Sequence, residues 1–288
     1  MVLLAADGVA IEAVHEPADF DADVTHDAAG WVPVTVVAHG FTGSAGRPHV
    51  RRAAAVFRRY GAVITFSFRG HGASGGRSTV GDREVLDLAA AVAWARRLGH
   101  RTVWTVGFSM GGSVVLRHAA LYPAGGPDAH ASGHADGRRS GPAEGHGSDH
   151  ADTHGPAHTD AVVAVSAPAR WYYRGTAAMR RLHWVVTRPL GRAVGRYGLR
   201  TRIHTSDWDP VPLDPAEAAA RIAPTPLLLV HGDRDPYFPL DHPRALATAA
   251  GPQADLWLEP GMGHAENAAD EALLARIADW AARQAPGG

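Results

Sequence analysis

The chain has 288 residues, and its 28 Lys and Arg residues nearly balance its 29 Asp and Glu residues, which leaves a formal net charge of -1 at pH 7. No global electrostatic field therefore draws the protein to nucleic acid or to an anionic membrane, and any charge effect must be local. The sequence has no cysteine, which excludes disulfides, thiol nucleophiles and cysteine-ligated metals and is compatible with a reducing cytoplasm. The length favours one large α/β domain with an insertion.

We expect no export signal or membrane anchor in the N-terminal residues. Their apolar run breaks at Asp7 and Gly8 before a signal core or a membrane span could form, and no basic segment precedes it. We therefore expect a cytoplasmic protein without stable membrane insertion. The Asp7-Gly8 pair is typical of a tight turn, which predicts a β-hairpin at a sheet edge over residues 2–4 and 9–14.

Apolar runs typical of strands buried on both faces alternate with helical patterns along the rest of the chain. The expected strands are 34–38, 62–68, 103–108, 161–167, 226–230 and 255–258. Apolar residues at helical spacing predict helices over 48–60 and 82–98, with Asp82 at the start of the second, and a closing helix that contains Leu273, Ile277 and Trp280. This alternation predicts right-handed βαβ units and a mostly parallel sheet covered on both faces.

Residues 124–159 interrupt the alternation. Gly, His, Asp, Ser and Pro dominate this segment, so it cannot bury enough apolar surface to offset the entropy of ordering, and we expect a disordered surface loop. Its histidines could bind a transition metal, although a flexible tract without fixed geometry is a weak and unselective site, or the loop could be an insertion without function. These histidines are His130, His134, His146, His150, His154 and His158.

A second interruption, residues 169–203, contains nine arginines and no acidic residue. Interleaved aromatic side chains suit one or two short amphipathic helices, broken near Pro189 and Gly191. One interpretation is a lid whose aromatic side chains face a pocket and whose guanidinium groups face outward or toward an anionic substrate; the alternative is a solvated basic surface. The candidates for lining an apolar pocket are Phe41, Trp171, Tyr172, Met179 and Trp184.

The stretch VWTVGFSMGG, residues 103–112, ends an expected strand in a G-x-S-x-G motif, and a helix-compatible segment follows at once. A serine on such a strand-to-helix turn sits in a strained conformation, and Gly107 and Gly111 remove the bulk on either side of it. Ser109 is therefore a candidate nucleophile, and the Met110 amide, which opens the helix, is a candidate donor to an oxyanion. The alternative is a glycine-rich loop that binds nothing.

The loops after two other expected strands face the same region. After residues 34–38, the glycine in His39-Gly40-Phe41 permits a close turn, which makes the Phe41 amide a second candidate oxyanion donor. His39 is expected to be a buried structural imidazole. The turn over 69–74 contains His71, which we also expect to be structural.

Two further loops offer the remaining members of a catalytic triad. Asp233 and Asp235 both follow the strand over 226–230, and either carboxylate could orient an imidazole. His264 follows the last expected strand and is flanked by glycine-containing sequence. Serine, acid and histidine thus occur in the chain order of an α/β-hydrolase site.

Five motifs in this order carry a family resemblance: HGFTGS at 39–44, RGHGAS at 69–74, GFSMGG at 107–112, and HGDRD and GMGH near the C-terminus. The chain resembles the α/β-hydrolase superfamily, in particular the serine-hydrolase branch that contains carboxylesterases, monoacylglycerol lipases and feruloyl-type esterases. The resemblance implies a twisted sheet of about eight strands with helices on both faces. It further implies a core over 1–168 and 204–288 and a helical lid over 169–203, after the sixth strand.

The resemblance also assigns the site. It implies that Asp235, not Asp233, is the acid of the triad, that Phe41 and Met110 donate to the oxyanion, and that no metal or organic cofactor is needed. Ser67 departs from the family, because many relatives have an acidic or amide residue two positions before the arginine of the RGHG turn.

The expected function is hydrolysis of a small or medium-sized, partly apolar carboxylic ester through an acyl-enzyme. Serine at the elbow argues against haloalkane dehalogenases and most epoxide hydrolases, which place aspartate there. Thioesterases, lactonases, amidases, carbon–carbon bond hydrolases and acyltransferases use similar machinery and stay open. The other classes of function are a non-catalytic ligand-binding protein and an adaptor that binds anionic surfaces through the arginine-rich segment. The sequence indicates a small-molecule partner, no nucleic acid, and no particular oligomeric state.

Overall fold

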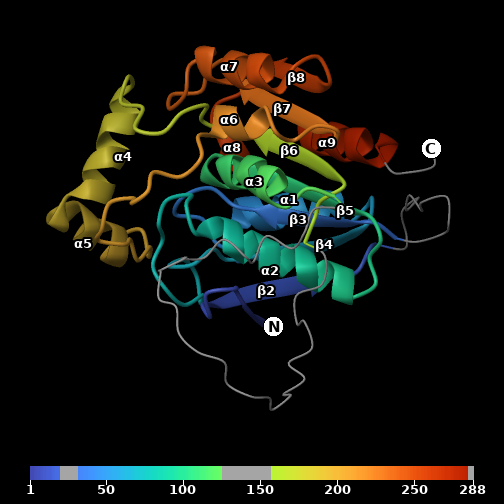
Figure 1. Ribbon diagram of the computed structural model, residues 1–288, viewed down its shortest axis with the longest axis horizontal. Coiled ribbons are helices and arrows are strands. Elements are labelled where there is room, and N and C mark those ends of the chain that lie inside the picture. The colour runs from blue at the N-terminus through green and yellow to red at the C-terminus, as the bar shows by residue number, and fades with distance from the viewer. Residues whose placement is uncertain (20–31, 125–156, 285–288) are drawn as a thin grey trace, which may run out of the picture.

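The computed structural model describes residues 1–19, 32–124 and 157–284, and Figure 1 shows its arrangement. One sheet of eight strands, in the order β1-β2-β4-β3-β5-β6-β7-β8, forms its centre. The strands are β1 (Val2–Leu4), β2 (Ala10–Glu16), β3 (Val34–Ala38), β4 (Ala62–Phe66), β5 (Val103–Phe108), β6 (Ala161–Val165), β7 (Leu227–Gly232) and β8 (Ala254–Glu259). β1 and β2 pair antiparallel at one edge and the remaining strands are parallel to one another, which confirms the expected edge hairpin and mostly parallel sheet.

Helices cover both faces of the sheet (Figure 1). They are α1 (Pro48–Phe57), α2 (Glu84–Arg97), α3 (Met110–Leu121), α4 (Ala177–Thr187), α5 (Pro189–Tyr197), α6 (Pro215–Ala219), α7 (Asp241–Ala250), α8 (Ala265–Ala268) and α9 (Glu271–Arg283). Among the described residues, no helix combines the length and apolarity that crossing a bilayer requires. Most of the segment expected to be a disordered loop, including all its histidines except His158, lies outside the described residues.

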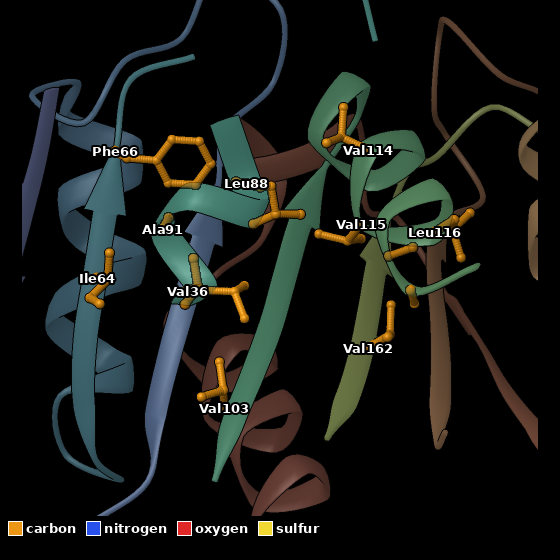
Figure 2. Packing of buried hydrophobic residues seen from close by; sticks show 14 of the residues in the cluster. Val36, Ile64, Phe66, Leu88, Ala91, Val103, Val114, Val115, Leu116 and Val162 are labelled. Atoms are coloured by element: carbon orange, nitrogen blue, oxygen red, sulfur yellow. The ribbon is translucent and has the colours of Figure 1, made fainter. Parts of the chain in front are cut away.

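The alternation of side chains along each strand divides the core into two layers. In β5, Val103 packs with α2 and α3, whereas Trp104 and Val106 point to the opposite face and pack with α1 and α9. Figure 2 shows the first layer, where valines of β3, β5 and β6 meet leucines of α2 and α3. Because both faces are covered, every residue of β3, β4, β5 and β6 is buried, which explains their unbroken apolar runs.

The start of α2 differs from the expectation at Asp82. The helix begins at Glu84, and Asp82 instead lies 3.4 Å from the Arg117 guanidinium on α3. The buried Glu84 carboxylate accepts hydrogen bonds from the amides of Thr79 (2.9 Å) and Gly81 (3.0 Å) in the preceding loop. One helical side chain therefore organises a loop that borders the cavity described below.

The helical hairpin of α4 and α5 projects from the side of the sheet (Figure 1). Pro189 is the first residue of α5, as expected for a break between two helices. Gly191 does not break the second helix: it is buried inside α5, where an added Cβ would lie 2.3 Å from the Trp184 carbonyl oxygen of α4. Glycine at this position allows the two helices to pack closely.

Candidate active site

Ser109 occupies a sharp turn between β5 and α3. Its backbone has φ 52° and ψ -112°, in the left-handed half of the map that a non-glycine residue rarely adopts, and its amide donates to the Val165 carbonyl oxygen at 2.8 Å. An added Cβ at Gly107 would lie 2.2 Å from the Gly111 carbonyl oxygen, and one at Gly111 would lie 2.2 Å from the Ala38 carbonyl oxygen. The glycines are thus required by backbone contacts across the turn, as the motif predicts.

Ser109, His264 and Asp235 form a continuous hydrogen-bonded chain. The His264 Nε2 atom lies 2.8 Å from Ser109 Oγ, and its Nδ1 atom lies 2.7 Å from Asp235 Oδ2. With Nδ1 protonated and donating to the carboxylate, Nε2 is free to accept the serine proton. The three residues follow the carboxyl ends of β5, β8 and β7, which meet at one edge of the parallel sheet.

The carboxylate of Asp235 is fully buried, and its bonds keep it ionised. Its Oδ1 atom accepts hydrogen bonds from the amides of Tyr237 (2.8 Å) and Phe238 (3.1 Å). Burial by itself raises the pKa of Asp235, but the hydrogen bond and charge of His264, together with these amides, outweigh burial and hold the pKa below its ordinary value. Asp233 instead is exposed and accepts from the Gly261 amide at 2.6 Å. The structure therefore brings Asp235, and not Asp233, to His264.

Two aromatic rings surround the imidazole of His264. The Tyr237 ring lies 4.3 Å and the Phe238 ring 5.8 Å from the imidazole, measured between centroids. His231, which is buried, bonds the Phe238 carbonyl oxygen through Nε2 at 2.8 Å. The loop that supplies Asp235 and both rings is thus anchored by a second histidine.

The loop after β3 lies against Ser109. The Gly40 amide donates to Oε1 of the buried Glu266 at 3.0 Å, and an added Cβ at Gly40 would lie 3.4 Å from Ser109 Cβ. Within the described part of the chain, neither the Phe41 amide nor the Met110 amide donates a hydrogen bond to a protein atom. Both are therefore available to a ligand beside Ser109.

His39 and His71 support this loop from below. Both are fully buried, as expected for structural imidazoles. His39 accepts from the Phe68 amide at 3.0 Å, and His71 accepts from the Thr42 amide at 3.3 Å. Burial, reinforced by the nearby His71, lowers the pKa of His39 to about 3, so this ring is neutral at physiological pH.

Ser67, which differs from the residue that many relatives have at this position, forms two hydrogen bonds. The Ser67 hydroxyl donates to Glu12 Oε2 at 2.8 Å and accepts from the Ala45 amide at 3.1 Å. The same Glu12 oxygen accepts from the Ala73 amide at 3.0 Å. Where many relatives have an acidic or amide residue, this chain has Ser67. The carboxylate of Glu12, on β2, bonds both Ser67 and the RGHG turn instead.

A cavity of about 540 Å³ opens beside Ser109. Aromatic and aliphatic side chains dominate its wall, and most of them come from α4 and the segments on either side of the helical hairpin. The apolar wall includes Phe41, Val80, Met110, Trp171, Tyr172, Tyr173, Met179, Leu182, Val186, Ile203, Trp208 and Phe238. A pocket of this size next to Ser109 can hold an acyl chain or an aryl group of moderate size.

Four of the five residues expected to line an apolar pocket do so. Phe41, Trp171, Tyr172 and Met179 border the cavity, whereas Trp184 is exposed on the outer side of the helix and does not reach it. Helical spacing gives the reason, because the residues of α4 that face the cavity recur every three or four positions and leave Trp184 off their face. They are Met179, Leu182, His183, Val186 and Thr187.

Trp208 is a cavity residue that sequence reasoning missed. Its indole N–H donates to the Thr79 carbonyl oxygen at 2.7 Å, and its ring packs against Trp171, with 5.1 Å between ring centroids. The Trp171 indole N–H points to the carbonyl oxygens of Pro212 and Leu213, at 3.0 and 3.2 Å. Because main-chain carbonyls hold both indoles, their orientations are fixed. No local sequence motif around Trp208 predicts these contacts.

Metal ligands do not gather in the part of the chain that the structure describes. No group of three or more histidine, aspartate or glutamate side chains there could hold a metal ion. The histidine-rich loop lies largely outside these residues, so its metal affinity stays a prediction from the sequence.

A comparison of the sequence with known families gives a result that agrees with the arrangement of Ser109, His264 and Asp235 on a parallel sheet. The family described as "Alpha/beta hydrolase family" matches residues 16–277. The chain belongs to this family. No curated protein sequence matches this hydrolase.

Solved structures similar to this alpha/beta hydrolase include esterases. An esterase from Pyrococcus furiosus has a TM-score of 0.65 and 20% identity, over 98% of this chain and 91% of its own. A serine hydrolase from Xanthomonas campestris, described as lacking a lid, has a TM-score of 0.59 and 19% identity, over 100% and 95% of the two chains. A Butyrivibrio proteoclasticus protein with ferulic acid bound has a TM-score of 0.56 and 18% identity, over 98% and 96%. Likeness at these identities establishes the fold.

Proposed function

We propose that this protein is a serine hydrolase that cleaves a carboxylic ester through an acyl-enzyme. The observation that carries the proposal is the His264 imidazole, which bonds Ser109 Oγ at 2.8 Å and Asp235 Oδ2 at 2.7 Å beside the cavity. A ligand-binding protein has no chemical need for this arrangement. The esterases among its structural neighbours agree with the same reaction.

In the acylation half-reaction, Ser109 Oγ attacks the carbonyl carbon while its proton passes to His264 Nε2. The buried Asp235 carboxylate stabilises the resulting imidazolium. The amides of Phe41 and Met110 donate to the oxyanion of the tetrahedral intermediate. When the intermediate collapses, the imidazolium protonates the leaving oxygen, the ester C–O bond breaks, and the acyl group stays on Ser109.

Deacylation repeats these steps with water as the nucleophile. His264 accepts a proton from the water that attacks the acyl carbon, and it returns the proton to Ser109 Oγ as the carboxylic acid leaves. Each proton transfer uses a group of this chain, so the scheme requires no metal or organic cofactor.

The proposed substrate is small or medium-sized and partly apolar. The cavity of about 540 Å³ and its aromatic wall support this choice. We propose that residues 169–203, which contain the α4–α5 hairpin (residues 177–197), form a lid, because the inner face of α4 forms part of that wall. A structural neighbour described as lacking a lid supports a role of the hairpin in substrate selection and not in the chemical step.

A panel of chromogenic substrates tests the proposal. We expect hydrolysis of p-nitrophenyl esters with a preference among acyl lengths, and slower turnover of matched thioesters and anilides. Ser109→Ala should lower kcat by a factor of about a thousand or more, because the nucleophile is lost. Equal activity in the wild type and Ser109→Ala would overturn the mechanism, and faster turnover of thioesters or anilides would overturn the ester assignment.

A further inference from the structure

Positive charge is concentrated in the segment that contains α4 and α5. Residues 170–202 hold nine of the chain's 28 basic residues and no acidic one, although the net charge of the whole chain is -1. In the described part of the chain, only Arg170 among these nine pairs with a carboxylate, that of Asp241 at 2.6 Å. Arg180 and Arg192 donate to backbone carbonyls of the same segment, which holds the side chains without neutralising them.

Large apolar side chains are exposed on the same two helices. The exposed fractions are 44% for Trp184, 68% for Leu190, 44% for Val194 and 80% for Tyr197. Leu190, Val194 and Tyr197 recur at intervals of four and three residues, so they form one stripe along α5. Exposed aromatic and aliphatic groups at helical spacing are unusual for a surface that meets only water.

The outer face of α4 combines the two features. Trp184 lies four and three positions after Arg180 and Arg181, so the three side chains share one side of α4, and Arg188 follows at the end of the helix. A shallow surface pocket is lined by Trp184, Val185 and the first two of these arginines. The opposite face of α4 borders the cavity beside Ser109. One helix therefore separates the basic, apolar outer face from the candidate active site.

We propose that the outer face of the α4–α5 hairpin docks on lipid surfaces that carry anionic headgroups. Guanidinium groups pair with lipid phosphates, while Trp184 and Tyr197 place apolar rings with polar edges at the headgroup boundary. Leu190 and Val194 insert among the first methylene groups of the acyl chains. The projection of the hairpin from the body of the protein leaves this face accessible (Figure 1).

Docking would also place the candidate active site near the lipid surface. The outer and inner faces of α4 are separated by about 10 Å, the diameter of a helix, so docking holds the cavity close to the lipid–water boundary. Apolar esters concentrate at this boundary. This consequence depends on the proposed esterase function, whereas docking itself does not.

Two other partners fit the surface less well. In a two-fold dimer through this face, the unpaired arginines of one copy would lie opposite those of the other, and like charges repel. Nucleic acid would pair with the arginines, but the phosphate backbone offers no apolar environment for Leu190 and Val194. Their exposure favours a lipid surface.

Sedimentation with vesicles tests docking on the full-length Ser109→Ala protein, which removes any effect of turnover. We expect binding to phosphatidylcholine vesicles that contain about 30% phosphatidylglycerol, and loss of binding to pure phosphatidylcholine vesicles. Raising NaCl from about 50 mM to about 500 mM should weaken the binding, because salt screens surface charges.

Matched variants locate the surface. Arg181→Gln, Arg188→Gln and Arg196→Gln combined should lower the partition coefficient by about a hundredfold, and Trp184→Ala by about tenfold. The control combines Arg51→Gln, Arg221→Gln and Arg244→Gln, which are exposed outside the hairpin and should change binding little. An unchanged thermal midpoint verifies that each variant is folded.

Three results would overturn the proposal: no binding of the parent protein to anionic vesicles at low salt, equal loss in the control, or binding of duplex DNA with failure to bind vesicles. Each leaves the esterase proposal untouched, because hydrolysis of water-soluble p-nitrophenyl esters is measured without lipid. Conversely, a protein without esterase activity that still binds vesicles would refute the proposed function and retain docking.

Discussion

The Glu266 carboxylate is a buried acid close to the proposed nucleophile that the proposed mechanism does not use. It lies two residues after His264 and accepts the Gly40 amide hydrogen at 3.0 Å, while Arg52 donates to its backbone oxygen at 2.7 Å. Glu266 thereby ties the turn that carries His264 to the loop that carries the Phe41 amide. We infer that it is a positioning residue for the oxyanion donor.

Substitution of Glu266 separates this positioning role from charge. Glu266→Ala leaves the Gly40 amide without its acceptor and frees the loop, so kcat for a p-nitrophenyl ester should fall by about tenfold to a hundredfold with little change in KM. Glu266→Gln keeps an acceptor oxygen and should retain most of the activity. Equal losses in both variants would contradict the role, as would an effect confined to KM.

Single residues were predictable from the sequence where a local motif marks them. Ser109 stands in a G-x-S-x-G motif, and the chain order of serine, acid and histidine singled out His264. The residues alone left Asp233 and Asp235 as alternatives, and only the family resemblance chose between them. Glu266 and Trp208 were missed, because their partners are loops brought close by the fold and not by sequence.

The turn between β5 and α3 is the element on which the candidate site depends most. At Gly111, an added Cβ would lie 2.2 Å from the Ala38 carbonyl oxygen, and neither backbone can move without shifting β3 or α3. We expect Gly111→Ala to lower the free energy of unfolding by about 3 kcal/mol, with loss of ester hydrolysis. Urea denaturation followed by circular dichroism measures the change.

Gly46 provides the matched control for this prediction. An added Cβ there meets no atom within 4 Å, so Gly46→Ala should change the free energy of unfolding by less than about 1 kcal/mol. Similar effects of the two substitutions would show that the turn tolerates a side chain at Gly111.

At the scale of elements, strands were easier to predict than helices. Continuous apolar runs marked β3 to β7 because both faces of the sheet are covered there, whereas β8 lies at the edge of the sheet and is only partly buried. The helices α6 and α8 were not predicted, since they span only five and four residues. The ten-residue helix α7 was also missed. On α4, the expectation for Trp184 followed from its aromatic character, whereas the helical period assigns it to the outer face.

Buried histidines make the stability of the whole molecule sensitive to acid. Burial lowers the pKa of His39 and of His118 to about 3, and burial together with Arg170 lowers the pKa of His242 to about 4. The unfolded chain binds protons at these positions below an ordinary pKa of about 6.5, whereas the folded chain does not. Stability contributed by each neutral ring is therefore present above pH ~6.5 and decreases as the pH falls toward the folded value.

We expect the free energy of unfolding to decrease below pH ~6.5 by up to ~1.4 kcal/mol per pH unit for each of these histidines. His118→Leu should make the free energy of unfolding less dependent on pH, because leucine does not titrate and the unfolded chain then binds one proton fewer. Urea denaturation at about pH 7, 6 and 5 measures how the free energy of unfolding changes with pH. A variant with the same slope as the wild type would contradict the assignment of His118 as a neutral buried ring.

The overall architecture was predictable because alternating strands and helices permit few topologies. The eight-stranded sheet, the edge hairpin and the helices on both faces agree with that prediction. The shape of the cavity was not predictable, since its wall combines the loop after β3, α4 and the segment around Trp208. Such walls depend on how distant segments pack.

The central claim is that His264 activates Ser109 for attack on a carbonyl. Labelling with a fluorophosphonate, followed by mass spectrometry of the digested protein, tests it most directly. We predict one adduct, on Ser109, in the folded wild type, no adduct in Ser109→Ala, and labelling at least about a thousandfold slower in His264→Ala. An unlabelled Ser109 in folded wild-type protein, or an unchanged labelling rate in His264→Ala, would contradict the claim.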